Sequence, residues 1–131
     1  MKRLLMGLML LVTAGAANAG WTIVGDTGDD GDAFIQYVDR ATIRRNGNFV
    51  KMWDLKNYKT VQTNAGYSYL LSMTQREFDC KEEKLRILAL TWFSGQMGNG
   101  NPVYSGSDPE KWSPVYPGSI GESTWKIACG K

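Results

Sequence analysis

The chain has 131 residues, with 15 Lys and Arg against 13 Asp and Glu, and it contains no histidine. Without imidazole it lacks the base of Ser-His-Asp and Cys-His sites and the commonest protein ligand for zinc and copper, which excludes those classes. Nucleic-acid binding draws its affinity from clustered positive charge, so the nearly balanced charges give that function no support.

Residues 1–19 have the pattern of a secretory signal peptide. Lys2 and Arg3 form a basic start, residues 4–12 are apolar, and the small residues Ala17 and Ala19 precede the cleavage point. The apolar run is shorter than the ~20 residues that cross a bilayer, so we expect export without a transmembrane anchor. Residues 20–131 then form one domain with 13 charges of each sign.

The two cysteines are Cys80 and Cys129. An even pair in an exported protein predicts one disulfide. A reactive thiol pair is the alternative, but the chain has no Cys-x-x-Cys motif and no histidine to hold a thiolate.

Stretches rich in β-branched and aromatic residues predict about five strands. These strands are residues 21–24, 33–38, 49–58, 67–78 and 85–93. Asp39 is expected to cap a short helical turn over residues 40–45, which ends at Asn46 and Gly47. Residues 60–66 read as a polar turn, and residues 81–84 as a charged hairpin that makes its flanking strands antiparallel.

The C-terminal part has a loop and a helix. Residues 94–118 are rich in glycine and proline, with Val103 and Tyr104 as a short edge strand. Ser119 and Glu122 have capping-box spacing, so we expect a helix that ends at Gly130. Cys129 in its last turn would tie this helix to the end of the fourth strand. The fold class is α+β: an antiparallel sheet of about five strands packed with a C-terminal helix.

The segment from Asp26 to Asp32 raises the question of calcium. Asp26, Asp30 and Gly31 fit positions 1, 5 and 6 of an EF-hand loop, but Gly28 and Tyr37 occupy positions 3 and 12, where ligands are needed. Gly and Asp are also the residues that turns prefer. The pattern therefore predicts a solvated turn, and we expect no metal and no cofactor.

Two groups of residues are candidates for a protein contact. Trp112 and Tyr116 lie in the proline-rich loop and suit an exposed aromatic contact. Lys81, Lys84 and Arg86 form a basic ridge that is either a solvated turn or a contact for an acidic partner. The carboxylates near the hairpin and in the loop are expected to be solvated, so a carboxylate-based hydrolase is a weaker alternative and we expect no enzyme.

Three motifs together resemble the surface-adhesin protein E family. They are KMWDLKNYKTVQ from Lys51, FDC from Phe78 and WKIACG from Trp125. The resemblance covers residues 21–131. It implies an exported domain of Gram-negative bacteria, with an antiparallel sheet packed on helices and cysteines at the positions of Cys80 and Cys129.

The resemblance also implies adhesin-like binding of host extracellular-matrix or serum proteins. Surface-displayed members are lipoproteins, whereas this chain has no lipidation cysteine, so we expect the periplasm, with the cell surface or secretion as alternatives. A periplasmic housekeeping or lysozyme-inhibitor-type module is the alternative function.

Overall fold

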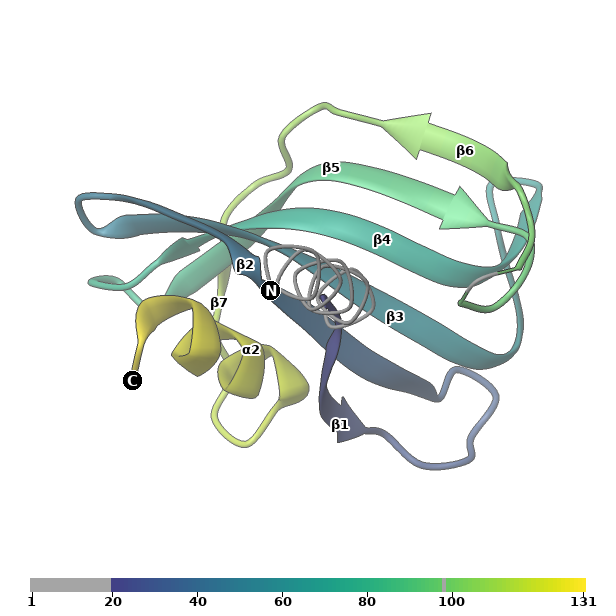
Figure 1. Ribbon diagram of the computed structural model, residues 1–131, viewed down its shortest axis with the longest axis horizontal. Coiled ribbons are helices and arrows are strands. Elements are labelled where there is room, and N and C mark those ends of the chain that lie inside the picture. The colour runs from purple at the N-terminus through teal and green to yellow at the C-terminus, as the bar shows by residue number, and fades with distance from the viewer. Residues whose placement is uncertain (1–19, 98) are drawn as a thin grey trace, which may run out of the picture.

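A computed structural model describes residues 20–97 and 99–131, and the expected signal peptide lies outside them. In the described part, β1 to β6 form one antiparallel sheet in chain order, β7 pairs with β5, and a single helix, α2, packs against the sheet (Figure 1). The elements are β1 (Thr22–Asp26), β2 (Phe34–Asn46), β3 (Phe49–Asn64), β4 (Tyr67–Asp79), β5 (Lys84–Phe93), β6 (Pro102–Gly106), β7 (Ser113–Pro114) and α2 (Ile120–Cys129). The α+β class is confirmed, and the strand number is larger than expected.

Short hairpins set the register of the central strands. Asn46 pairs with Phe49 across a two-residue turn, and Asn64 pairs with Tyr67 across Ala65 and Gly66. Both residues of the second turn have positive φ, 51° and 83°, as a type I′ hairpin turn requires. Because these strands turn directly into one another, the order of the central strands in the sheet follows the chain order.

The expected helical turn over residues 40–45 is wrong, because β2 continues through them. Asp39 does accept a hydrogen bond from the Ala41 amide, as a capping residue would, at 3.1 Å. The result is a sheet irregularity between Asp39 and Arg44, where the Thr42 hydroxyl accepts from the Trp53 amide of β3 at 2.9 Å. Strand pairing across the Gly47 turn thus prevails over the local capping signal.

The polar turn expected over residues 60–66 is also wrong, except for its last two residues. β3 runs on to Asn64, and Gln62 and Thr63 pair with Tyr69 and Ser68 of β4. The β-branched residues in this stretch favour a strand although its composition is polar. A register shift between Asn57 and Gln62 interrupts the pairing with β4.

The main core lies between α2 and the part of the sheet near the β2–β3 and β4–β5 hairpins. It consists of buried residues from three strands and the helix: Val38, Val50, Met52, Phe78, Trp125, Ala128 and Cys129. The Trp125 indole N–H donates to the Asp79 carbonyl at 3.0 Å, so this large side chain is buried with its polar atom satisfied.

Both ends of α2 are built as its sequence indicates. The Ser119 hydroxyl accepts from the Glu122 amide at 3.1 Å, and Gly130 ends the helix with a left-handed φ of 70°. The disulfide between Cys80 and Cys129 joins the last turn of α2 to the end of β4, with a Cα–Cα distance of 5.7 Å. The predicted disulfide and its place are confirmed.

Replacing Ala65 by Asn should stabilise the domain. Ala65 sits at φ 51°, a conformation that is unfavourable for Ala but common for Asn in Asn-Gly hairpin turns. We expect about 1 kcal/mol more unfolding free energy in urea, because Asn adopts the left-handed conformation at lower cost than Ala. Gly66→Ala is the matched control and should destabilise; a destabilising Ala65→Asn change would contradict the turn assignment.

Removing both cysteines should have a larger effect. The bond closes a loop with a sequence separation of 49 residues, so Cys80→Ala with Cys129→Ala is expected to cost about 4 kcal/mol of unfolding free energy. Urea unfolding measures the loss, and thiol titration of the denatured, unreduced wild type should find no free thiol. Unchanged stability would mean that α2 docks independently of the bond.

Candidate binding surfaces

The sequence-predicted contact residues gather where the β4–β5 hairpin meets β7. The Arg86 guanidinium lies 4.5 Å from the centre of the Trp112 ring, and that ring lies 5.8 Å from the ring of Phe49. Arg86 also donates from Nε and Nη2 to one carboxylate oxygen of Glu77, at 2.9 and 2.7 Å. Arg86 is therefore fixed between an acid and an aromatic ring, and it supports Trp112.

The other predicted residues lie around this centre. Lys84 pairs with Pro114 of β7, which holds the chain between Trp112 and Tyr116 against the hairpin. Lys81 and Lys84 are exposed, and Tyr116 is 66% exposed. We call these residues the hairpin-end surface; it consists of Phe49, Lys81, Lys84, Arg86, Trp112 and Tyr116. Sequence reasoning missed Phe49, which is 41% exposed, because its contact with Trp112 joins residues far apart in the sequence.

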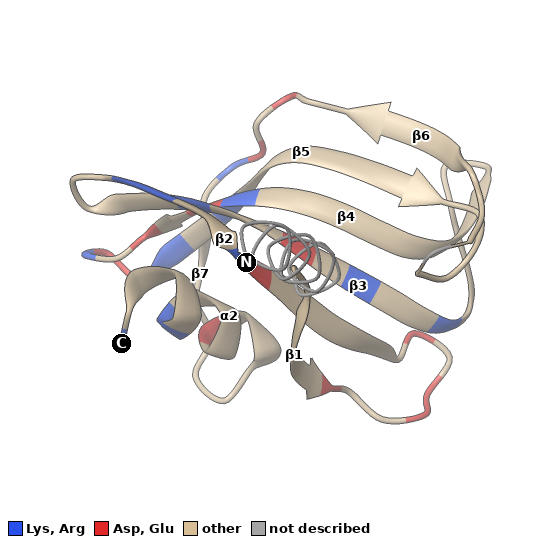
Figure 2. Ribbon diagram, in the orientation of Figure 1, with Lys and Arg blue, Asp and Glu red and all other residues tan. Residues whose placement is uncertain are grey.

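Charge is distributed unevenly over the molecule. Basic residues concentrate at the end that holds the β2–β3 and β4–β5 hairpins, whereas the β1–β2 loop at the other end is acidic (Figure 2). The hairpin segments contribute five basic side chains against two exposed acids: Arg44, Arg45, Lys51, Lys81 and Lys84 against Glu82 and Glu83. This end of the molecule is complementary to an acidic surface.

A band of aromatic rings crosses the sheet from β2 to β6. One ring comes from each strand: Phe34, Tyr58, Tyr69, Trp92 and Tyr104. Successive ring centres are 5.5, 5.7, 4.4 and 4.8 Å apart, and Tyr69 and Trp92 are stacked with an interplanar angle of 4°. Tyr67 adds a sixth ring beside Tyr104, at 5.2 Å.

This aromatic band lies on the same sheet face as α2. Alternate residues of a strand share a face, and Phe34 is four residues from Val38, which packs against the helix. Burial raises the pKa of the Tyr58 hydroxyl to about 12. Sequence reasoning did not find the band, because Tyr58 and Tyr69 meet only through the register shift between Asn57 and Gln62.

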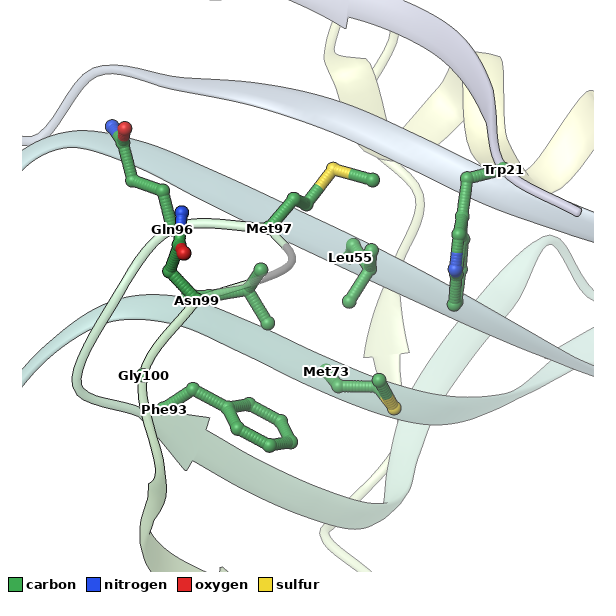
Figure 3. Close-up of a pocket in the computed structure, with 9 residues that line it drawn as sticks. Trp21, Leu55, Met73, Phe93, Gln96, Met97, Asn99 and Gly100 are labelled. Atoms are coloured by element: carbon green, nitrogen blue, oxygen red, sulfur yellow. The ribbon is translucent and has the colours of Figure 1, made fainter. Parts of the chain in front are cut away.

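The opposite sheet face has an apolar groove of about 310 Å³ (Figure 3). Its lining residues are Trp21, Leu55, Leu71, Met73, Phe93, Gln96, Met97, Asn99 and Gly100. Leu55 pairs across the strands with Met73, and Trp21 and Gln96 stand at opposite sides of the groove. Its flexible methionines and aromatic rings suit an apolar group.

The aspartate-rich loop is organised by a lysine. The Lys59 ammonium on β3 lies 2.7 Å from Asp26 and 3.4 Å from Asp29, and it also donates to the Gly28 carbonyl. The hydrogen bond from Lys59, followed by that from the Gly28 amide, lowers the pKa of Asp26 below its ordinary value. Within residues 20–97 and 99–131, no three acidic or cysteine side chains form a metal-binding group. In the same residues, no helix has the length and apolar character to cross a bilayer.

The fold and these surfaces define a small disulfide-bonded domain with several faces suited to binding. The profile of the surface-adhesin protein E family matches residues 21–130, and the chain belongs to this family. No curated protein sequence matches the chain.

Solved structures of Haemophilus influenzae protein E share the fold. Crystal form II has a TM-score of 0.62 and 11% identity, and the match covers 86% of this chain and 89% of that one. The selenomethionine form has a TM-score of 0.61, 11% identity and coverage of 86% and 88%. At 11% identity, the similarity to these structures shows a shared fold.

Replacing Lys59 by Met should raise the pKa of Asp26 towards its ordinary value, because the ammonium that favours the charged carboxylate is lost. An NMR titration of the Asp26 carboxyl carbon measures this change. Lys51→Met, elsewhere on β3, should leave the Asp26 pKa unchanged. If Lys59→Met also leaves it unchanged, the ion pair does not exist in solution.

Proposed function

We propose that this chain is an exported, non-enzymatic protein-binding domain of the bacterial cell envelope. Its membership of the surface-adhesin protein E family supports the adhesin-like role. Host extracellular-matrix or serum proteins are the partner class, and export through residues 1–19 is part of the proposal.

The arrangement of side chains at the hairpin-end surface supports this surface as the one that binds the partner. Arg86 is held between Glu77 and Trp112, while Lys81, Lys84 and Tyr116 are free to contact a partner. A prearranged aromatic and arginine centre with a charged rim is a common form of protein interface. The excess of basic side chains around it favours a partner with an acidic patch.

The test is binding of the mature domain to immobilised laminin and vitronectin. We expect saturable binding that weakens with salt, because exposed charges are screened. The double variant Lys81→Gln with Lys84→Gln should weaken binding roughly three- to tenfold, chiefly through slower association. Tyr116→Ala should weaken it independently of salt.

The matched control is Val61→Glu with Thr63→Glu, which changes the net charge by the same amount on exposed positions far along β3. This control should bind like the wild type. Wild-type protein that binds neither laminin nor vitronectin would contradict the partner class. Equal losses in both double variants would show that net charge, and not the hairpin-end surface, governs the binding.

A further inference from the structure

A small cavity lies between the first turn of α2 and the sheet. Its volume is about 100 Å³, and Gln36, Lys56, Arg76 and Thr124 line it together with Leu85. Liquid water occupies ~30 Å³ per molecule, so the space equals roughly three water volumes, which suits a group of a few heavy atoms such as a carboxylate. The cavity is separate from the hairpin-end surface and from the apolar groove.

One of its two cations is already neutralised. Asp54 is fully buried, and its Oδ2 accepts from Arg76 Nε at 2.6 Å. The Arg76 side chain is itself only 13% exposed. This hydrogen bond uses one of the five N–H groups of the guanidinium, whose fork geometry allows it to hold a second oxyanion at the same time.

The second cation, Lys56, has no acidic partner within ion-pair distance among the described residues. Its ammonium lies 4.6 Å from the centre of the Phe34 ring, at the start of the aromatic band. Burial, and then the nearby charge of Arg76, lower the pKa of Lys56, and the charge of Asp54 only partly offsets this. A half-buried cation beside another cation is a costly arrangement unless an anion joins it.

The rest of the cavity wall is mixed, because Gln36 and Thr124 are polar whereas Leu85 and Ile120 are apolar. The Gln36 side chain is nearly buried, and its amide makes one long bond, of 3.4 Å, to the Tyr37 carbonyl. Ile120 and Gly121, the first residues of α2, close the cavity on the helix side. The first amides of a helix add partial positive charge at that end.

We propose that this cavity binds a single carboxylate group between Lys56 and Arg76. With Asp54, these cations carry a net charge of +1, which one carboxylate neutralises and a phosphate dianion would overcompensate. The carboxylate belongs either to a free small acid or to an Asp or Glu side chain of a partner. The proposal does not rest on the adhesin-like function, because it concerns a different surface and is tested on the isolated domain.

The test is an NMR titration of the ¹⁵N-labelled mature domain with acetate at constant ionic strength. We expect saturable shifts of the Gln36 side-chain amide and of the Gly121 and Thr124 amides. Acetamide, the neutral analogue, should produce none of these shifts, and phosphate should bind more weakly than acetate. No saturable acetate shift at these groups, or tighter binding of phosphate, would overturn the proposal.

Lys56→Met keeps most of the side-chain length and removes the charge. It should weaken acetate binding by about tenfold or more, the usual effect of losing a hydrogen bond to a charged group. Lys51 is exposed on the same strand, and the Lys51→Met variant should bind acetate like the wild type. Equal affinities in the two variants would overturn the assignment of Lys56. Substitution of Arg76 is not a suitable test, because its loss would leave Asp54 buried without a counter-charge.

N-acetylglutamate α-amide distinguishes the two sources of the carboxylate. It presents the side-chain carboxylate next to a peptide-like backbone. Binding of both compounds at the same amides supports a partner's acidic side chain, and binding of acetate alone supports a free small acid. Binding of neither compound overturns the proposal.

Discussion

The structure depends on the docking of α2 against one face of the sheet. Trp125 and Cys129 carry this contact: the indole is buried with its N–H bound to Asp79, and the disulfide ties the last turn to Cys80 at the end of β4. Arg45 adds a hydrogen bond from β2 to the Cys129 carbonyl at 3.2 Å. A domain of this size buries only a small hydrophobic core, so a covalent bond between its helix and its sheet contributes a large share of its stability.

One helix is too short to cover a face of six strands. Beyond the first turn of α2 the aromatic band covers the sheet instead, and its stacked and edge-on rings shield one another and the strands beneath them. Between helix and band lie the charged residues Asp54, Lys56 and Arg76. The cavity thus lies at the boundary between α2 and the aromatic band, where the side chains of the helix and those of the band do not meet. Incomplete cover of the sheet therefore leaves this cavity.

Local patterns predicted much of this fold, and contacts distant in sequence explain what they missed. The caps of α2, the disulfide and the β4–β5 hairpin follow from short motifs. Capping by Asp39 is visible in the sequence, but the strand pairing that prevails over it is not. Residue type and charge predicted the hairpin-end residues. The sequence did not predict that Arg86 lies between Glu77 and Trp112, because this contact joins β4, β5 and the loop before β7. The aromatic band depends on a register shift that no residue pattern encodes.

We propose that the basic hairpin end is the surface that contacts a protein partner. Amide hydrogen exchange of the domain, free and bound to laminin or vitronectin, checks this proposal without a substitution because it locates the contact. On binding, we expect slower exchange in residues 80–86 and 112–116, and unchanged exchange in the acidic loop over residues 26–32. Protection confined to that loop or to the apolar groove would contradict it.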